Sequence, residues 1–479
     1  MSLTLDTNIN SLNAQRNLTT SQANLSQALQ RLSSGLRINS AADDAAGLAI
    51  ASQFTTQING TNQAVHNAND AISETQTAGG ALSTLTDNLQ SIRTLAVEAA
   101  NGSNSAADRA ALDAQVQQQI AEITRIASQT SFNGLNVLDG SSGVTTYQVG
   151  ANVGNTISVN LSQGVRADQI GQYASSTNTV TGTALATGDL SLQVGNGPVV
   201  SVAASVAGTG NQGQTAGSAY ALAQSINSAG ITGLTATATT STAAATFTTV
   251  AGGASGGTYA LSINGINVFG SGGQAIAIAG TLTQSSVQTA INAVSTQTGV
   301  TAAADSTGKL VLTAADGSNI TAVQAVTGTV TGGAGAGTTT ATFGKLTVSA
   351  ASAVTVAGVT PGSAGLTAGT IAASTGLLST QNVLTVAGAN SAIHAVDSAL
   401  ATVSAFQSQL GAIQNRFTST VSNLQATSQN LTSSRSTIQD ADFAAETAKL
   451  TQSQVLQQAG ISVLAQANQA PQLILKLLP

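Results

Sequence analysis

VDSALATVSAFQSQLGAIQNRFTSTVSNLQATSQNLTSSRSTI, residues 396–438, carries a large apolar residue at every seventh position. This spacing places the apolar side chains on one face of an α-helix, and six consecutive heptads exceed the three or four that indicate a coiled coil. A helix with one apolar stripe needs a partner to cover it. The repeated positions are Val396, Val403, Leu410, Phe417, Leu424, Leu431 and Ile438.

Apolar residues near the N-terminus follow a related rhythm. Leu25, Leu29, Leu32 and Leu36 lie four, three and four residues apart, and Leu5, Ile9 and Leu12 precede them in the same rhythm. Further along, Ile58, Val65 and Ile72 lie seven residues apart, and spacings of three and four resume at Leu82. We expect one helix to pass through Gly79 and Gly80 with a local adjustment and to end near Asn101.

The last segment, from Val455 to Leu478, is apolar as well and includes Leu456 and Leu464. Because apolar stripes occur at both ends of the chain, the economical arrangement pairs the N- and C-terminal helices with each other. The alternative is two unrelated helical domains at opposite ends. We predict a long, antiparallel, coiled-coil-like core built from the paired termini.

A polar segment, RLSSGLRINSAADDAAGLAIA at residues 31–51, interrupts the first helical stretch. Ser40 followed by Asp43 has the pattern of a helix start, and Asp43 and Asp44 suit the positive end of a helix dipole. Asn39 permits a turn, and Arg37 is a candidate ion-pair partner for either aspartate. We interpret the segment as a joint between two helices rather than as a catalytic loop.

The middle of the chain has another composition. Most residues between 176 and 390 are Gly, Ala, Thr, Ser or Val, which favours short strands joined by glycine-rich turns over a disordered linker. The stretch at 221–239 resembles that at 287–305, because each has a short helix closing on Ile-Asn before a Thr/Ala-rich strand. We predict two strand-strand-helix-strand modules, at about residues 185–250 and 257–330.

Composition excludes several functions. Charged residues make up 7% of the chain, the net charge is −6 and there is no Lys/Arg cluster, so we expect no nucleic-acid partner. With no Cys and two isolated His, we find no catalytic, metal or cofactor site and predict that the protein is not an enzyme. The first residues do not read as a cleavable signal peptide, and no window approaches the roughly 20 apolar residues of a membrane span.

Several long motifs, in the same order at both ends, resemble bacterial flagellins. They are LSSGLRINSAADDAAGLAIA at 32–51, NLQSIRTLAVEAANGSNS at 88–105, SQTSFNGLNVLDG at 128–140 and the segment from Arg435 to Pro479. The resemblance covers about the first 170 and the last 85 residues, and the repeat modules are similar to inserts that some flagellins carry.

The resemblance implies a structural subunit that assembles with copies of itself into the extracellular flagellar filament, for swimming motility. It further implies secretion through the flagellar type III export apparatus, an export chaperone, and contact with the filament cap and hook-associated proteins. A hook-associated axial protein, or a surface adhesin on a flagellin-like core, is the alternative.

The expected fold is α+β and multidomain, with β-rich outer domains inserted into the helical core. Its parts are an inner-core helix at 1–40, outer-core helices and a β-hairpin at 41–175, a variable surface insert at 176–390, an outer-core helix at 391–450 and an inner-core helix at 451–479.

The resemblance also marks Gln90, Ser91, Arg93, Leu95 and Gln115 as a candidate stretch for an innate immune receptor. Many flagellins sensed by a Toll-like receptor carry Arg where this chain has Ser91, and commonly Glu at Gln115. Because a guanidinium forms bidentate hydrogen bonds that serine cannot replace, weak receptor recognition is expected.

Overall fold

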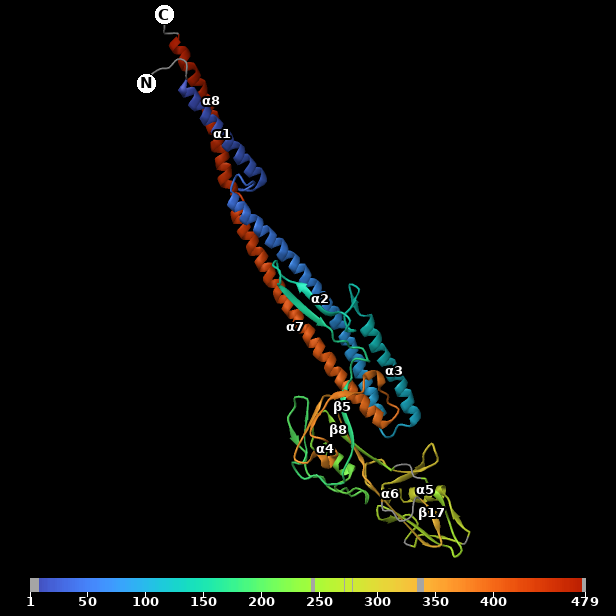
Figure 1. Ribbon diagram of the computed structural model, residues 1–479. Helices are drawn as coiled ribbons and strands as arrows, with labels where there is room; N and C mark the ends of the chain where they lie inside the picture. The colour runs from blue at the N-terminus through green and yellow to red at the C-terminus, as the bar shows by residue number, and fades with distance from the viewer. Residues whose placement is uncertain (1–7, 243–245, 271, 278, 334–339, 476–479) are drawn as a thin grey trace. The chain divides into compact units, whose positions relative to one another are not determined.

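The computed structural model describes residues 8–242, 246–270, 272–277, 279–333 and 340–475. Leu5 and the last residues of the Val455–Leu478 stripe lie outside these ranges. The chain divides into two compact units, Met1–Thr77 with Gly143–Leu161 and Gln409–Pro479, and Ala78–Ser142 with Ser162–Ser408. Long helices from both ends and a strand-rich middle confirm the predicted α+β class (Figure 1).

The terminal regions form five long helices: α1 (Ile9–Ser34), α2 (Ala45–Ala99), α3 (Ala106–Gln129), α7 (Val386–Gln439) and α8 (Phe443–Leu475). Helix α2 passes through Gly79 and Gly80 without interruption and ends just before Asn101. Helix α3 starts with a capping box, in which Ser105 and Asp108 satisfy each other's backbone N–H groups. The gap between α7 and α8 at 440–442 precedes the expected boundary at 450.

In the first unit, helices from the two ends of the chain pair antiparallel. Figure 1 shows α1 beside α8, and the amide of Asn8 donates to the carbonyl of Ala467 at 2.9 Å. The first part of α2 runs antiparallel to the last part of α7, where Ser428 donates to Asn62 at 2.9 Å. The hairpin of β3 (Gly143–Gln148) and β4 (Thr156–Leu161) belongs to the same unit. It places the Tyr147 ring edge-on to Phe417, with centroids 5.9 Å apart.

Small side chains form the buried face of α2 in this unit. Val65 and Ile72, which the heptad count selects, are only half-buried, whereas Ile58 is buried. The residues that are buried next to them are Thr61, Ala64, Ala68, Ala71 and Thr75, together with Glu74, whose carboxylate accepts a hydrogen bond from the Tyr147 hydroxyl. Along α7, Leu410 and Phe417 are buried, and Leu424, Leu431 and Ile438 are half-buried. The buried face of α2 is therefore centred on the residues just before Val65 and Ile72, such as Ala64 and Ala71. Alanine at these positions allows two helices to approach closely.

In the second unit, α3 buries Val116, Ile120, Ile123 and Ala127, and the last part of α2 buries Leu82, Leu85, Leu89 and Ile92. The segment just before α7 is tied to α3, because Asp113 accepts from the N–H of Val383 at 2.8 Å and Gln117 donates to the carbonyl of Gln381 at 2.9 Å. Strands β1 (Ser131–Phe132) and β2 (Leu135–Asn136) form a small hairpin after α3.

The β-rich part of the second unit contains two hydrophobic clusters, one for each predicted module. The first cluster gathers residues from β6 (Ser191–Val194), α4 (Ala219–Ser228), β8 (Leu234–Ser241), β19 (Lys345–Ala350) and β20 (Val354–Ala357). Strands β19 and β20 come after the second module in the sequence but pack in the first cluster. The first module is therefore built from two segments of the chain, one before and one after the second module. This discontinuity differs from the contiguous 185–250 module expected.

The second cluster gathers residues from β9 (Thr248–Ala251), β10 (Gly257–Ile263), α5 (Gln284–Ala293), β14 (Thr301–Ala304) and β15 (Leu310–Ala314). Strand β9 falls at the end of the expected first module but packs in this second cluster. The short helix α6 (Ser295–Thr298) follows α5.

A six-stranded antiparallel sheet joins the modules in the order β14-β15-β8-β19-β5-β22. Three smaller sheets have the orders β11-β10-β16-β18 with β12 on β10, β13-β9-β17, and β21-β20-β6-β7. The remaining elements are β5 (Tyr173–Thr179), β7 (Val200–Ser201), β11 (Ile266–Asn267), β12 (Gln274–Ile276), β13 (Thr281–Leu282), β16 (Ile320–Gly328), β17 (Thr331–Gly333), β18 (Thr340–Thr342), β21 (Gly369–Ile371), β22 (Ala373–Thr375) and the 3₁₀ turns η1 (Pro361–Ala364) and η2 (Leu378–Thr380).

The insert begins and ends on adjacent strands. Ala174 of β5 pairs with Ala373 of β22, and the hydroxyl of Ser398 on α7 donates to the carbonyl of Gln172 just before β5. The chain therefore leaves the helical part and returns to it at neighbouring positions. Among the residues that the structure describes, no helix is both long and apolar enough to span a bilayer.

Candidate assembly surface

The α1–α8 pair leaves many large apolar side chains in solvent. Leu29 is 48% exposed and Leu456 is 50% exposed, although both belong to the predicted stripes. Leu25, Leu32, Leu36 and Leu464 are half-buried. Other exposed apolar residues on these two helices are Ile9, Leu12, Phe443, Val455, Ile461 and Val463. Apolar surface of this extent is rare on monomeric proteins and marks an interaction site.

A charged cluster fixes the pair near the joint. The Arg31 guanidinium lies 3.2 Å from Glu446 and 3.9 Å from Asp43, and Lys449 lies 3.4 Å from Glu446. The Glu446 side chain is only 6% exposed, and the two cations offset the cost of burying its carboxylate. The cluster therefore joins α1, α8 and the turn before α2 through ion pairs.

The joint itself is held by the backbone of the opposite end. The N–H of Arg37 donates to the carbonyl of Gln439 at 2.7 Å, the N–H of Ala441 donates to the carbonyl of Gly35 at 2.9 Å, and Leu36 forms a bridge with Asp440. The break between α1 and α2 therefore lies beside the break between α7 and α8, and backbone hydrogen bonds join the two breaks. Gly35 adopts a left-handed conformation, with φ of 71°, that ends α1.

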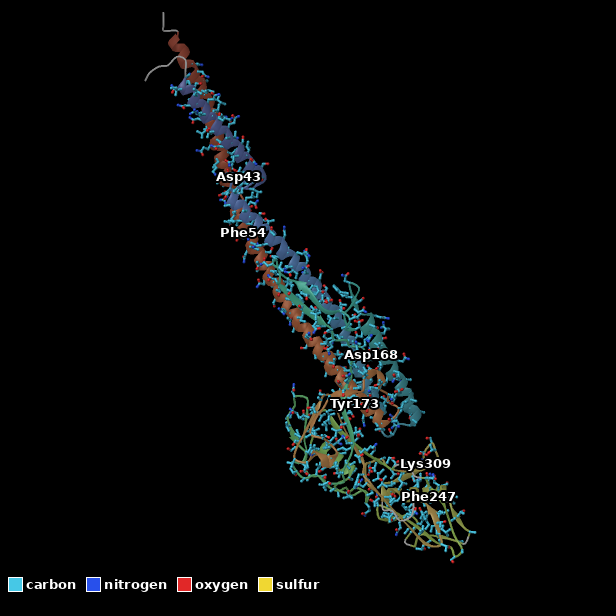
Figure 2. The ribbon with its side chains drawn as sticks, viewed as in Figure 1. Asp43, Phe54, Asp168, Tyr173, Phe247 and Lys309 are labelled. Atoms are coloured by element: carbon cyan, nitrogen blue, oxygen red, sulfur yellow. The ribbon has the colours of Figure 1, made fainter. Side chains whose placement is uncertain are left out.

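The two aspartates of the joint have separate roles. Asp43 (Figure 2) accepts from the N–H of Ser40 at 3.0 Å, from its hydroxyl, and from the N–H of Asn39. These hydrogen bonds, led by that of the Ser40 backbone, hold the pKa of Asp43 below its usual value. Asp44 instead caps α2, because its side chain accepts from the N–H of Gly47 at 2.9 Å. Ser40 is thus part of the preceding turn, not the helix cap that its spacing suggests.

Arg37 does not pair with either aspartate. Its guanidinium donates to the carbonyl of Ile438, and the cation beside Asp43 is Arg31. Asp442 likewise caps the start of α8, accepting from the N–H of Ala444 at 2.9 Å. An Asp just before an apolar helix is a capping signal, so this role is visible in the sequence.

The candidate receptor stretch lies on α2 and α3 in the second unit. Gln90, Ser91, Arg93 and Gln115 are exposed, and Leu95 is half-buried. Arg93 is engaged in an ion pair with Asp397 at 2.7 Å, and the Ser91 hydroxyl donates to the carbonyl of Asp87 at 3.0 Å.

The sequence does not reveal the environment of His394, because it shows only an isolated histidine. It is 7% exposed, contacts the Thr235 hydroxyl through Nε2 at 2.6 Å and stacks on Tyr173. Burial lowers the pKa of His394, against the opposing effect of Asp397. Within the described residues, no group of three or more His, Asp or Glu side chains is arranged to hold a metal ion.

Comparison with known proteins gives consistent matches at both ends and across the insert. The bacterial flagellin N-terminal helical region matches residues 5–143, the bacterial flagellin C-terminal helical region matches residues 393–478, and the flagellin hook IN motif matches residues 260–316. The B-type flagellin of Pseudomonas aeruginosa is 41% identical over 501 residues, covering 100% of both chains.

A flagellin of Serratia marcescens is 52% identical over 171 residues, covering 36% of this chain and 48% of that one. Among solved structures, FliC from Burkholderia pseudomallei has 27% sequence identity and a TM-score of 0.30, over 72% of this chain and 99% of that chain.

Proposed function

This chain belongs to the bacterial flagellin family, and from that premise we propose how its surfaces serve a filament. As a flagellin it is a structural protein, a subunit of the extracellular flagellar filament that serves swimming motility. A hook-associated role has weaker support, because a relative that matches this chain over its whole length is a flagellin.

The observation that carries the proposal is the apolar surface of α1 and α8. Side chains such as Leu29, Leu456 and Ile461 are about half exposed in the single chain and need cover. Contacts between identical chains that do not close on themselves build helical filaments. We assign this helix pair to the inner layer of the filament, with other copies as its cover. The joint residues Arg37, Asn39, Ser40, Asp43 and Asp44 connect this layer to an outer helical layer, and residues 176–390 face outward.

Truncation tests the assignment. Deleting Val455–Pro479 removes most of the exposed apolar side chains of α8 and should leave a folded chain that does not polymerise from seeds. Electron microscopy of seeded protein is the measurement, with circular dichroism to check folding. Filaments of normal diameter from the truncated chain would refute the assignment.

The same surface suggests how the chain is handled before assembly. Export through the flagellar type III apparatus would expose α8 to other proteins, and Val455, Leu456 and Ile461 offer an export chaperone an apolar face. Hydrogen exchange of α8 with and without a purified export chaperone tests this role. Unchanged exchange across 455–463 would count against it. At the growing end, the cap and the hook-associated proteins are the remaining partners we assign.

Recognition by the innate receptor is proposed to be weak. Ser91 stands where sensed flagellins commonly carry Arg, and Arg93 is already paired with Asp397. A reporter-cell assay with monomer should give a weak response that rises in a Ser91→Arg variant. A wild-type response equal to that of an enteric flagellin would contradict the proposal.

A further inference from the structure

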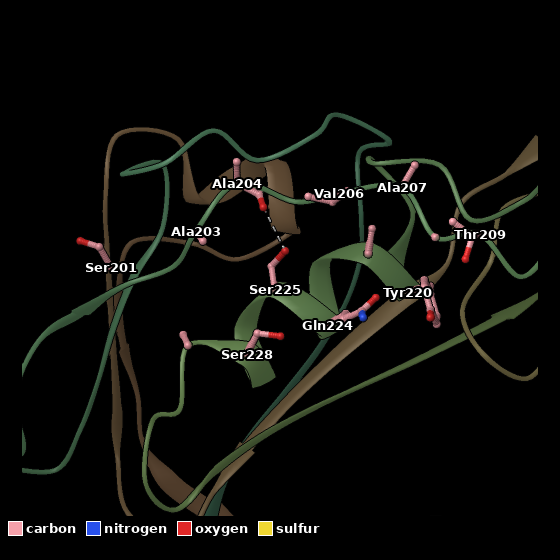
Figure 3. A pocket seen from close by; sticks show the side chains of 13 residues that line it. Ser201, Ala203, Ala204, Val206, Ala207, Thr209, Tyr220, Gln224, Ser225 and Ser228 are labelled. Atoms are coloured by element: carbon pink, nitrogen blue, oxygen red, sulfur yellow. Dashed lines mark hydrogen bonds between the residues drawn. The ribbon is translucent and has the colours of Figure 1, made fainter.

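Helix α4 of the first module lies between two cavities. A loop from Ser201 to Thr209 crosses one side of the helix and encloses about 420 Å³ (Figure 3). The loop is joined to the helix by a hydrogen bond from the Ser225 hydroxyl to the carbonyl of Ala204 at 3.5 Å. On the other side, α4, strand β8 and the start of α7 enclose about 940 Å³. Both volumes fall in the range of roughly 300–1,000 Å³ typical of small-molecule sites.

Three residues of α4 line both cavities: Tyr220, Gln224 and Ser228. They lie four residues apart and so form one stripe along the helix. Figure 3 labels all three on α4 beneath the loop. We call this stripe, together with Thr237 and Asn390 of the larger cavity, the α4 groove.

The two cavities are lined by alanines and by polar side chains, and the carboxylate among these residues is that of Asp316. No Lys or Arg lines either cavity among the described residues. Asp316, the carboxylate at the larger cavity, already accepts hydrogen bonds from Asn211, Gln214 and Ser318. By contrast, within the described residues the side chains of Gln224, Asn390 and Thr237 and the hydroxyl of Tyr220 have no hydrogen-bond partner.

The fold does not require these side chains. Helix α5 of the second module corresponds to α4, because Asn292 makes the same contacts as Asn227. On that alignment, Ser285, Thr289 and Ala293 of α5 stand where α4 has Tyr220, Gln224 and Ser228. The second module thus forms the same helix-to-strand arrangement without an aromatic ring or an amide at these positions. Folding alone therefore does not explain why the first module carries Tyr220 and Gln224.

We propose that the α4 groove binds an uncharged oligosaccharide. Sugar hydroxyls both donate and accept hydrogen bonds, as do the amides of Gln224 and Asn390 and the hydroxyl of Thr237. The half-exposed ring of Tyr220 offers an apolar face against which a sugar ring packs. The lack of cations leaves nothing to compensate a sialic acid carboxylate or a sulfate. This role goes beyond filament assembly and does not depend on it.

The test uses the full-length chain as monomer on an array of neutral oligosaccharides of glucose, galactose, mannose and N-acetylglucosamine, with sialylated and sulfated counterparts. The strongest neutral probe is then titrated in solution. A Tyr220→Ser/Gln224→Thr double variant carries the residues that the second module already tolerates. The matched control, Ser285→Ala/Thr289→Ala, changes the equivalent stripe of α5. An Asn390→Ala variant removes the amide of the opposite wall and decides the matter if the double variant does not fold.

We expect binding of at least one neutral probe, with affinity reduced at least tenfold in the double variant and in Asn390→Ala, and unchanged in the control. Absence of binding to every neutral probe overturns the inference. So does equal binding by the groove variants, or a preference for the sialylated or sulfated counterparts.

Discussion

The side chain of Asn227 joins helix α4 to strand β8 by pairing with both backbone groups of Ala236. Its amide donates to the carbonyl of Ala236 and its carbonyl accepts from the N–H, both at 2.8 Å. Asn292 does the same to Ala302 in the second module, at 3.0 and 2.8 Å. The repeated Ile-Asn pair is therefore a helix-to-strand lock, in which the isoleucine fills the core and the asparagine pairs with the strand that follows.

Replacing Asn227 with Ala should destabilise the first module by about 1–3 kcal/mol, because both backbone groups of Ala236 lose their partner. Hydrogen exchange of β8 compared with β14 is the measurement, since only β8 should lose protection. Asn292→Ala should produce the reverse pattern. Equal loss of protection in both strands from either variant would show that the locks do not act locally.

Replacing Ala71 with Leu should destabilise the first unit by about 1–3 kcal/mol, because this fully buried position has no room for a larger side chain. Denaturant unfolding of the monomer measures the loss. Ala114→Leu, at an exposed position of α3, is the control and should change the stability little. If Val65→Ala were the more damaging substitution, the larger side chains rather than the alanines would form the seam.

Replacing Arg31 with Ala should weaken the α1–α8 pair by roughly 3 kcal/mol, because it leaves the buried carboxylate of Glu446 with Lys449 alone. The critical concentration for polymerisation should rise at least tenfold. Arg125→Ala breaks the exposed pair with Glu122 and serves as the control, since exposed pairs contribute at most about 1 kcal/mol. An unchanged critical concentration for Arg31→Ala would show that the charged cluster does not contribute to polymerisation.

His394 makes the stability of the second unit depend on pH. Burial lowers its pKa below the usual value of 6.5, so the folded chain resists protonation that the unfolded chain accepts. The contribution of neutral His394 to the free energy of unfolding is fully present above pH 6.5. It is lost as the pH falls from 6.5 towards the lowered pKa. His394→Gln keeps a polar partner for Thr235 and should flatten the pH dependence in this window. Thermal unfolding between pH 5 and 7.5 decides, and a wild-type curve that is flat from 6.5 to 5 would contradict the assignment.

The helical architecture could be predicted because it depends on residue spacing. The heptads of α7 and the polar joint near Asp43 are local patterns, and both appear in the structure as helix and break. The repeated Ile-Asn pair is likewise a local pattern, and each copy lies near the end of a short helix, α4 or α5.

What the sequence left undetermined depends on contacts between distant segments. The α2 seam moved from Val65 and Ile72 to neighbouring alanines, because close approach of two helices favours small residues that a search for large apolar side chains ignores. Strands β19 and β20 complete the first module although the whole second module separates them from it. The partner of Arg37 proved to be a backbone carbonyl, which no charge pattern reveals.

The insert enters and leaves the helical part of the second unit through neighbouring strands, because its first strand, β5, pairs with its last strand, β22. Any domain whose own ends lie a strand spacing apart, about 4.8 Å, could be exchanged at this point while α2, α3 and α7 keep their registers. Variation in the size and surface chemistry of the insert is thereby separated from the packing of α2, α3 and α7 within the second unit.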